Sequence, residues 1–554
     1  MLSVVIAWER VLNDDNLRGR CSGAMQGCLQ FLLMLITVAW HQLWALLHNH
    51  WWRRRQIMQW MRNYGIQGPP SRLLSGNLQE RNRLRKEATL HDMEVLSHDI
   101  VPRLMPDYVQ WSKIYGKSFV FWWGVEPRLA VYDLEHIKEL LSSKHVYALG
   151  RSKLQRKGVM HFIGRGLLMA NGDAWTHQRR VVAPAFHVHK LKYQLDHMVQ
   201  CTSELVKVWN EVLNDSTQEE VEIEVSEHMS RLAGDIIAKT EFSGSHEKGK
   251  LIFLKLTQLQ KLSTQSSSES GPDHQRRIKK LKEGVESLFM EIIDSRRAAA
   301  AAAGNCKSYG QDLLGLMLAE MEAAKQVEAA DPQQRRQHGQ LGQLYSSQQL
   351  MDECKTFFFT GHETTWLLLT WTFMLLASNP TWQHRARHEA LHLMRLHGGL
   401  PDFDMLSRLK VLGMILLESL RLYTPATLLA REAFTSIKIA NLEIPKGLSV
   451  WVPVLAIHHD KNIWGEDADE FKPERFSDGV AKACKHPMAF MPFSFGPRNC
   501  VGQNFAMMEA KIVLCMLLSK FTFHLSPSYR HAPICVLTLQ PKHGVPIILR
   551  HFEP

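Results

Sequence analysis

The pattern of hydrophobic and polar positions predicts a mainly helical body with a minor β region. Most of residues 136–420 has the composition and the 3.6-residue period of helices. Residues 118–135 are rich in β-branched and aromatic residues around a central turn, which predicts a hairpin. Toward the C-terminus, strand-like runs at 448–457 and 534–541 alternate with turns. The pattern therefore favours a large α-rich fold with small sheets.

Two internal segments lack the pattern of a packed core. Residues 263–277 are polar and rich in serine, and residues 298–349 begin with six alanines and continue with charged residues and glutamine. Such compositions do not supply enough apolar surface for a core. We expect mobile connections or exposed helices in both segments.

A long buried helix is predicted from Ser347, a good N-cap, to the Ser378-Asn379-Pro380 stop. Its apolar residues occupy nearly every face, so we expect a central position. Its middle reads TGHETTW, which places a glycine, an acid and three hydroxyls in a buried helix at a cost in stability. Hydroxyls here can bond back to carbonyls four residues earlier and bend the helix. The stretch predicts an opened turn that holds water and passes protons.

The N-terminal region carries one long apolar run. Residues 29–47 have no formal charge over about the length of a bilayer core, and WWRRR follows at 51–55. The charge after the run predicts a single membrane pass with the body on the cytosolic side. A buried core helix is the alternative, because polar residues interrupt the run. The predicted organisation is a disordered extension over 1–28, a transmembrane anchor over 29–52, a basic and proline-rich hinge over 53–75 and a globular domain over 76–554.

Composition limits the partners. The chain has 554 residues and a net charge of +11, which fits a solvated basic surface, an anionic membrane face or an acidic protein partner. No basic helix, zinc finger or RNA-binding aromatic motif indicates nucleic acid. The nine cysteines are odd in number and include no CxxC pair, which disfavours a disulfide framework and a tetrahedral zinc site and suits a reducing compartment.

Several catalytic motifs are absent from the sequence. HETTW starts like the zinc motif HExxH, but Trp366 stands where the second histidine would fall. There is no P-loop, no GxSxG elbow and no complete dinucleotide-binding glycine loop. Electrons for redox chemistry are therefore expected from another protein.

The chain carries five separated motifs. One of them is a stiff loop, PFSFGPRNCVGQ, around a single cysteine. Each motif alone is weak, because ion pairs and aromatic–arginine spacings are common on helices, but their combination and order are specific. The motifs are FxxGxRxCxG with Phe493, Arg498 and Cys500; ExxR with Glu418 and Arg421; FKPERF with Arg475; WxxxR with Trp175 and Arg179; and the central helix with Gly361, Glu363 and Thr364.

This set resembles the cytochrome P450 family of haem-thiolate monooxygenases from about residue 65 to the C-terminus. The resemblance implies the cytochrome P450 fold, with haem b (iron protoporphyrin IX) between the central helix and the loop, and with Cys500 as the thiolate ligand of the iron. A thiolate ligand favours O–O cleavage. Glycines let backbone N–H groups approach the sulfur closely.

The resemblance also implies roles for the other residues. Phe493 would shield the sulfur. Propionate-holding residues would be Arg498, Trp175, Arg179 and Arg431. A buried ion-pair network behind the loop would consist of Glu418, Arg421 and Arg475. Protons for oxygen activation would come through Thr364 and Glu363.

Electrons would then come from NADPH through a separate NADPH–cytochrome P450 reductase, which docks on the cysteine side of a monomer. The family resemblance implies the endoplasmic reticulum membrane, with the catalytic domain facing the cytosol.

Three stretches, residues 97–119, 162–186 and 528–549, are similar to plant cytokinin trans-hydroxylases. Those enzymes hydroxylate the trans-methyl of the isopentenyl side chain of N6-isopentenyladenine-type cytokinins to give trans-zeatin forms, so the implied substrate is a small apolar or prenylated adenine. The basic loop with Arg151, Lys153, Arg156 and Lys157 either binds a substrate phosphate near the pocket mouth or is simply solvated. Other plant hormones or fatty acids (gibberellins, brassinosteroids) remain alternative substrates, and a haem-binding protein without oxygenase turnover is the alternative of another class.

The chain departs from the family pattern at several positions. Thr360 replaces Ala or Gly ahead of the helix glycine, and Trp366 replaces a small residue and could crowd the active helix. Thr424 and Ala430 replace prolines, and the segment 263–277 is shorter than its counterpart in relatives. We expect these changes to affect proton delivery and the helices that cover the substrate pocket.

Overall fold

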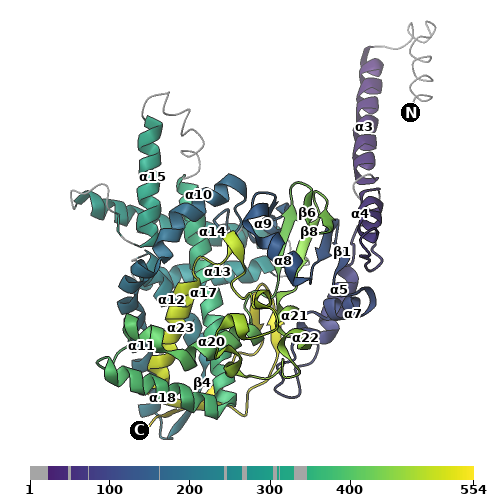
Figure 1. Cartoon of the computed structure of the whole chain (residues 1–554). Coiled ribbons are helices and arrows are strands. Elements are labelled where there is room, and N and C mark those ends of the chain that lie inside the picture. Colours follow the sequence, from purple (N-terminus) through teal and green to yellow (C-terminus); the bar gives the residue numbers. More distant parts are fainter. Residues whose placement is uncertain are drawn as a thin grey trace, which may run out of the picture. The chain divides into compact units, whose positions relative to one another are not determined.

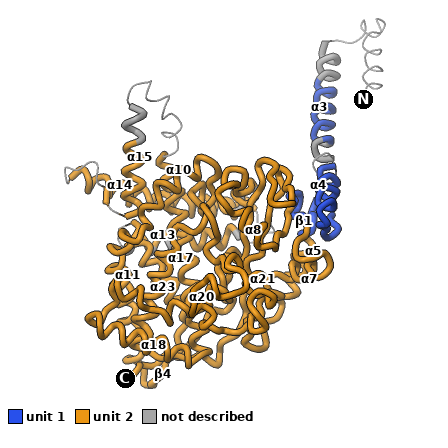
Figure 2. The backbone as a smooth tube through the Cα atoms, in the orientation of Figure 1, with its two compact units in different colours: residues 1–78, 120–127 blue, residues 79–119, 128–554 orange. Residues whose placement is uncertain are grey.

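The computed structural model describes residues 23–47, 52–72, 74–160, 162–242, 246–264, 271–302, 309–310, 312–329 and 346–553. The chain divides into two compact units (Figure 2). Unit 1 comprises residues 1–78 and 120–127, and unit 2 comprises residues 79–119 and 128–554.

Unit 1 contains the N-terminal helices α3 (Gly23–Leu47) and α4 (Arg53–Arg62). Helix α3 thus starts inside the expected extension, most of which lies outside the described residues, and α4 occupies the first part of the expected hinge. Arg54 explains why the basic run folds: its guanidinium lies 4.6 Å from the Trp122 ring centroid and donates to the Arg72 carbonyl at 2.5 Å. Burial of this side chain lowers the pKa of Arg54.

Helix α3 exposes a row of large apolar side chains. Their exposed fractions lie between 45% and 63% for Phe31, Leu32, Met34, Leu35, Ile36, Val38, Trp40 and Trp44. Within the part of the chain that the structure describes, no helix combines the length and the apolar character that crossing a membrane requires. The predicted transmembrane span is therefore not confirmed.

Unit 2 is mainly helical, as the sequence pattern predicts (Figure 1). Its central helix is α17 (Ser347–Ser378), against which α12 (Val225–Phe242), α20 (Lys410–Leu422) and α23 (Gln503–Leu518) pack. The other α-helices with bounds are α5 (Leu78–Ala88), α6 (Val101–Leu104), α7 (Pro106–Tyr115), α8 (Leu134–Leu141), α9 (Lys153–Val159), α10 (Gly172–Val182), α11 (Val188–Asn214), α13 (His246–Thr264), α14 (Pro272–Ala302), α15 (Leu313–Ala329), α18 (Pro380–Leu396), α19 (Phe403–Arg408), α21 (Val454–His458) and α22 (Lys461–Trp464). Short 3₁₀ turns are η2 (Ser143–His145), η3 (Ala183–Phe186), η6 (Pro473–Phe476), η7 (Val480–Lys482), η8 (Pro487–Ala489) and η9 (Gly496–Arg498).

Small sheets complete the fold. The predicted hairpin is confirmed as β1 (Phe119–Trp123) and β2 (Glu126–Ala130). Within unit 2, β2 pairs in parallel with β8 (Ser449–Val452), and the antiparallel strands β5 (Leu429–Ala433) and β3 (Leu149–Gly150) follow in that order. A second sheet has the order β4 (Glu220–Glu224), β12 (Pro546–His551) and β9 (Phe521–Leu525). Two further hairpins pair β6 (Ile437–Ile439) with β7 (Leu442–Ile444), and β10 (Pro533–Cys535) with β11 (Leu539–Pro541).

Two predicted strands need correction. The run 448–457 is a strand only as far as Val452, because Pro453 caps the short helix α21 that follows. The run 534–541 is two short strands joined by a turn, since Cys535 pairs with Leu539. Of the segments expected to be loosely structured, residues 313–329 form α15, while 265–270 and 330–345 lie outside the described residues.

Helix α17 matches its predicted ends within one residue. The Ser346 side chain accepts a hydrogen bond from the Gln349 N–H at 3.2 Å, and Asn379 caps the C-terminus. The helix continues through TGHETTW, so the predicted opened turn is wrong. Gly361 instead allows close packing, because a Cβ there would lie 2.6 Å from Ile237 Cδ1 on α12.

Candidate active site

The cysteine loop, residues 492–502, is held by its own backbone. The Cys500 N–H donates to the Phe493 carbonyl at 2.8 Å, and Ser494 adopts a positive φ of 63°. Gly496 has a φ of 71°, and a Cβ at this position would collide with the Leu141 carbonyl oxygen. A side chain at position 496 is therefore excluded by both backbone conformation and space. This geometry fixes where the Cys500 sulfur points.

The Cys500 thiol has accessible surface although protein atoms surround the loop closely. Burial raises the pKa of the Cys500 thiol, while the Gly502 N–H and the Arg179 charge act in the opposite direction. The Gly502 N–H and the Arg179 guanidinium stabilise the thiolate, whereas burial, the larger effect, favours the thiol. The loop also holds the Arg179 guanidinium in position, because Arg179 donates to the Asn499 carbonyl at 2.8 Å and to Asn499 Oδ1 at 2.9 Å.

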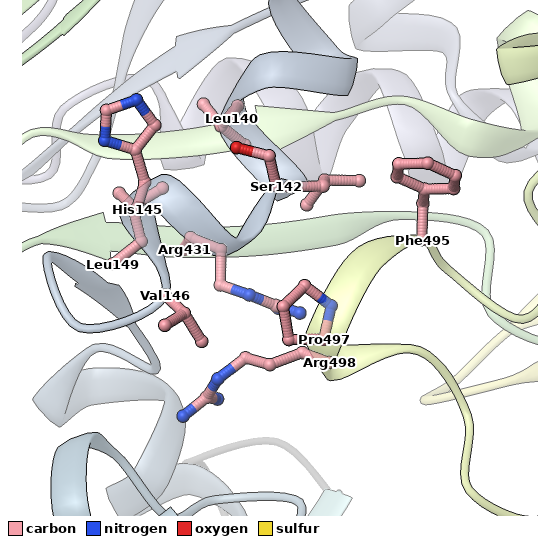
Figure 3. A pocket seen from close by; sticks show the side chains of 10 residues that line it. Leu140, Ser142, His145, Val146, Leu149, Arg431, Phe495, Pro497 and Arg498 are labelled. Carbon is pink, nitrogen blue, oxygen red and sulfur yellow. The ribbon is translucent and has the colours of Figure 1, made fainter. Parts of the chain in front are cut away.

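Three guanidinium groups converge beside the loop. Arg431 on β5 and Arg498 in the loop line the same small pocket, together with Phe495 (Figure 3). Burial pushes the pKa of Arg431 well below its usual value, and the charges of Arg151 and Arg498 lower it further. Burial lowers the pKa of Arg498 to about 10, with the Arg151 charge as the second cause.

These arginines have carbonyl partners but no anionic one. Arg498 donates to the Ala170 carbonyl at 2.8 Å, and Arg431 donates to the Ala430 carbonyl at 2.9 Å. The Nε of Arg498 is buried without a hydrogen-bond partner. Among the residues that the structure describes, no carboxylate forms an ion pair with any of the three. Because buried cations are normally paired, this cluster has the character of an anion-binding site.

The WxxxR motif reaches the same region from α10. The Arg498 guanidinium lies 4.6 Å from the Trp175 ring centroid, in a cation–π contact. Trp175 thus orients Arg498, and Arg179 braces the peptide next to Cys500. The structure brings both residues to the loop, as their motif suggested, but through protein contacts that the sequence did not specify.

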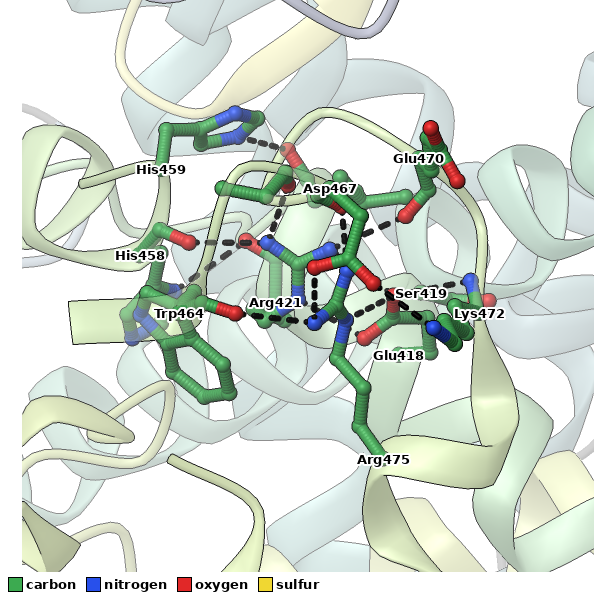
Figure 4. A network of polar contacts seen from close by, with 12 residues as sticks. Glu418, Ser419, Arg421, His458, His459, Trp464, Asp467, Glu470, Lys472 and Arg475 are labelled. Atoms are coloured by element: carbon green, nitrogen blue, oxygen red, sulfur yellow. Dashed lines mark hydrogen bonds and ion pairs between the residues drawn. The ribbon is translucent and has the colours of Figure 1, made fainter. Parts of the chain in front are cut away.

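A buried network lies behind the loop (Figure 4). Arg421 binds Glu418 through two hydrogen bonds of 2.7 and 2.8 Å, and neither side chain is exposed. Arg475 reaches Glu418 at 3.4 Å and Asp467 at 2.7 Å. The Lys472 N–H also donates to Glu418, at 3.0 Å. The three predicted network residues are therefore in direct contact.

The network continues to the cysteine loop through one histidine. The His458 carbonyl accepts from Arg421 at 2.9 Å, and His458 Nε2 accepts from the Met491 N–H at 3.1 Å. Met491 directly precedes the loop. Burial lowers the pKa of His458 to about 3, so the ring is neutral and can accept this bond. His458 has no motif of its own.

On α17, Glu363 is buried and accepts four hydrogen bonds. Oε1 accepts from Gln260 at 3.3 Å, Thr538 at 2.8 Å and Gln540 at 2.6 Å. Oε2 accepts from the Trp366 indole N–H at 3.3 Å. Trp366 therefore contributes a donor to the acid instead of only crowding the helix.

The neighbouring hydroxyls bond within the helix. Thr364 donates to the Thr360 carbonyl at 2.9 Å, and Thr360 donates to the Thr356 carbonyl at 2.8 Å. These are the back-bonds that the sequence suggested. Thr364 is half-buried, so its oxygen can still accept a further hydrogen bond.

Comparison with known proteins identifies the class. The sequence profile of the family described as Cytochrome P450 matches residues 102–544. The chain belongs to this family and is a cytochrome P450 monooxygenase. A solved structure, "Crystal structure of cytochrome P450DA heme domain", covers 88% of this chain and 98% of its own with a TM-score of 0.69, and its 24% identity supports the fold alone.

More similar sequences narrow the resemblance. Two curated relatives from Arabidopsis thaliana, both named Cytokinin hydroxylase, are 49% and 47% identical to this chain, across 94% of it and 98% of each relative. Cytochrome P450 709B1 from the same plant is 37% identical over the same shares. The chain is therefore a plant-type cytochrome P450 that resembles cytokinin hydroxylases, as the motifs predicted.

The family implies a haem with a thiolate ligand, and the residues fit that group. A cysteine with accessible surface stands in a rigid loop, with a backbone donor and a cation that favour the thiolate. The unpaired guanidinium groups beside it match the two propionates of haem b. Arg151 joins this cluster, whereas the sequence had suggested that it either binds a substrate phosphate or is solvated.

Proposed function

We propose that this chain hydroxylates the terminal trans-methyl of the isopentenyl side chain of N6-isopentenyladenine-type cytokinins, giving trans-zeatin forms. The observation that carries the proposal is the identity of 49% and 47%, over nearly the whole chain, to two proteins named Cytokinin hydroxylase. An unactivated C–H bond requires a strong oxidant, and a haem with a thiolate ligand supplies that chemistry when bound.

In this proposal the cysteine loop holds the cofactor. Cys500 provides the thiolate, which the Gly502 N–H and the Arg179 charge favour. Arg431 and Arg498 hold the propionates, and Trp175 keeps the Arg498 guanidinium in place. Phe493, which is half-buried, covers the sulfur and accepts the Cys500 N–H through its carbonyl.

Proton delivery is assigned to Thr364 together with water. Its hydroxyl donates back to the Thr360 carbonyl, which leaves the oxygen lone pairs facing away from the helix axis free to accept. Changing Thr364 to Ala should keep cofactor binding but lower the amount of product formed per NADPH. An unchanged ratio of product to NADPH would refute this role.

Electrons are proposed to come from NADPH through a separate cytochrome P450 reductase, and the net charge of +11 suits an acidic partner. We further propose that the exposed apolar side chains of α3 attach the chain to the endoplasmic reticulum membrane, with the catalytic unit in the cytosol. The chain acts as a monomer and does not bind nucleic acid in this proposal.

Turnover in microsomes that contain the reductase tests the substrate. Isopentenyladenine and its nucleoside and nucleotide are supplied beside a gibberellin, a brassinosteroid and a fatty acid, and each product is identified by mass and by comparison with cis- and trans-zeatin standards. The Cys500→Ala variant is the control for background oxidation. Hydroxylation of another compound without any trans-zeatin product would overturn the proposed substrate and leave the monooxygenase class intact.

A further inference from the structure

His459 lies beside the Glu418 network (Figure 4) and is a buried histidine whose two ring nitrogens both face oxygen acceptors. Its Nδ1 lies 3.0 Å from Asp469 Oδ1, and its Nε2 lies 3.0 Å from the Leu422 carbonyl oxygen. Only 3% of the His459 side chain is exposed. A carbonyl and a carboxylate accept hydrogen bonds but cannot donate them, so both ring nitrogens must carry a proton to complete the two contacts. The geometry therefore requires a positively charged imidazolium.

The acid that faces this ring is ionised. Burial acts to raise the pKa of Asp469, but the hydrogen bond and the charge of His459 outweigh burial, so the pKa of Asp469 is lowered. The charges of Lys461 and Arg421 act in the same direction as His459. Asp469 is therefore a carboxylate at neutral pH and cannot supply the proton that a neutral ring would need at Nδ1.

Neutral histidines adjoin the charged one. The titratable and charged groups that face the His459–Asp469 pair from the neighbouring elements are Arg421, Lys461, Asp99, His98 and His458. Burial lowers the pKa of both His98 and His458 to about 3, and the charge of His459 lowers each further. Of these three rings, His459 is therefore the one that carries the charge at neutral pH.

The two consecutive histidines also complete the C-terminus of α20, the helix with the ExxR motif. The Arg421 carbonyl accepts from His458 Nδ1 at 3.2 Å, and the Leu422 carbonyl accepts from His459. The last carbonyls of a helix have no partner within it, and the helix dipole favours a cation near them. His458 Nε2 accepts the Met491 N–H ahead of the cysteine loop. These two adjacent residues therefore join the end of α20 to the cysteine loop.

We propose that His459 is a positioning residue that binds Asp469 and the end of α20 as an imidazolium, and that its charge helps to hold the cysteine loop in the geometry of thiolate ligation. Loss of the ring proton would set a nitrogen lone pair against an oxygen at 3.0 Å, so one of the two contacts would break. The hold on the loop is full while the ring is protonated and weakens when the ring deprotonates. Histidine is the side chain that generally changes charge between about pH 5 and 8. The inference rests on ligation of the haem by Cys500 and is independent of the substrate.

Decay of the thiolate-type Soret band of the reduced carbon-monoxide complex tests this role. The purified holoprotein is held in mild urea, and the decay rate is measured from about pH 5.5 to 8.5. In the unchanged protein the rate should rise about tenfold with pH, the loss expected for one hydrogen bond to a charged group. His459→Arg keeps two donors and a charge that does not titrate, so its band should decay slowly across the whole range. Asp469→Asn offers an amide donor to a neutral ring, so it should also lose the pH dependence.

His397 provides the matched control, because it pairs with Asp402 at 2.7 Å through one ring nitrogen and that acid is 48% exposed. His397→Arg should leave the pH profile unchanged. His459→Gln, which has no charge, should decay fast at every pH; if it does not retain haem, the comparison of His459→Arg with the unchanged protein decides alone. A rise with pH that persists in His459→Arg would overturn the proposed role, and so would a decay rate of the unchanged protein that does not depend on pH. Absence of any thiolate-type band in the unchanged protein would refute the Cys500 ligation itself, and this role with it.

Discussion

The buried network around Glu418 offers a prediction with a matched control at Glu474, which directly precedes the network residue Arg475. Glu418 and Arg421 are fully buried and joined by two hydrogen bonds of 2.7 and 2.8 Å. Glu474 forms an equally short ion pair with Arg385, at 2.7 Å, but the two side chains are 48% and 43% exposed. Glu→Gln at each position removes one charge and keeps the shape of the side chain.

The expected magnitudes differ because of solvent. In Glu418→Gln, Arg421 keeps carbonyl partners at His458 and Ala468 but loses its counter-charge at a fully buried position. Removing one member of a buried ion pair costs about 3–5 kcal/mol. In Glu474→Gln, solvent screens both charges, and an exposed pair contributes about 0–1 kcal/mol. The two variants should therefore differ by about 3 kcal/mol.

Urea unfolding of the purified holoproteins, followed by tryptophan fluorescence, measures this difference from the shift in midpoint and the slope. The Glu418→Gln variant should also lose the thiolate-type spectrum at lower urea, because His458 connects Arg421 to Met491 at the start of the cysteine loop. Equal midpoints for Glu418→Gln and Glu474→Gln would refute the reasoning that burial makes the Glu418 network strong.

Four further outcomes are expected. Cys500→Ala should abolish the thiolate-type Soret band of the reduced carbon-monoxide complex, and a retained band would disprove the ligand assignment. Gly496→Ala should reduce haem retention after mild heating, because the new Cβ meets the Leu141 carbonyl at a φ of 71°; retention equal to that of the unchanged protein would show that the loop can relax. The pKa of His458 is lowered to about 3, chiefly by burial, against about 6.5 in the unfolded chain, so the unfolded chain alone binds this proton and stability should fall as the pH drops from 6.5 toward 3. His458→Asn should lower that slope by about 1.4 kcal/mol per pH unit, measured by urea unfolding at several pH values, and an identical slope would contradict a buried neutral ring. Deleting residues 1–55 should move the protein from the membrane pellet to the supernatant, whereas continued sedimentation would reveal a second attachment.

Local sequence signals predicted the elements that local physics determines. The N-cap at Ser346 and the stop at Asn379-Pro380 bracket α17 within one residue of the expected bounds, because capping needs only neighbouring residues. Glu418 and Arg421 meet because a helix brings residues three apart to the same face. The motif FKPERF indicated Arg475 without any helical spacing, and the contact then depended on the fold.

Local sequence signals gave wrong predictions at positions where tertiary packing determines the structure. The hydroxyls of TGHETTW suggested an opened turn, but Thr360 and Thr364 are satisfied by carbonyls one turn earlier, and Ile237 fills the space over Gly361. The helix therefore has no reason to open. The strand expected over 448–457 changes to helix α21 after Pro453, where the ladder with β5 also ends at Val452.

The same distinction explains the arginines that we propose to hold the haem. Arg498 could be predicted, because it belongs to the cysteine motif, and Arg431 follows from the family pattern. Arg151 carries no motif, and it reaches the cluster only because β3 ends beside β5, with Gly150 opposite Glu432. That pairing joins segments about 280 residues apart, which no spacing in the sequence encodes. The buried Arg431 beside the half-buried Arg151 and Arg498, without a carboxylate, is unfavourable in the protein alone, so binding of a dianionic cofactor would stabilise the fold that gathers them.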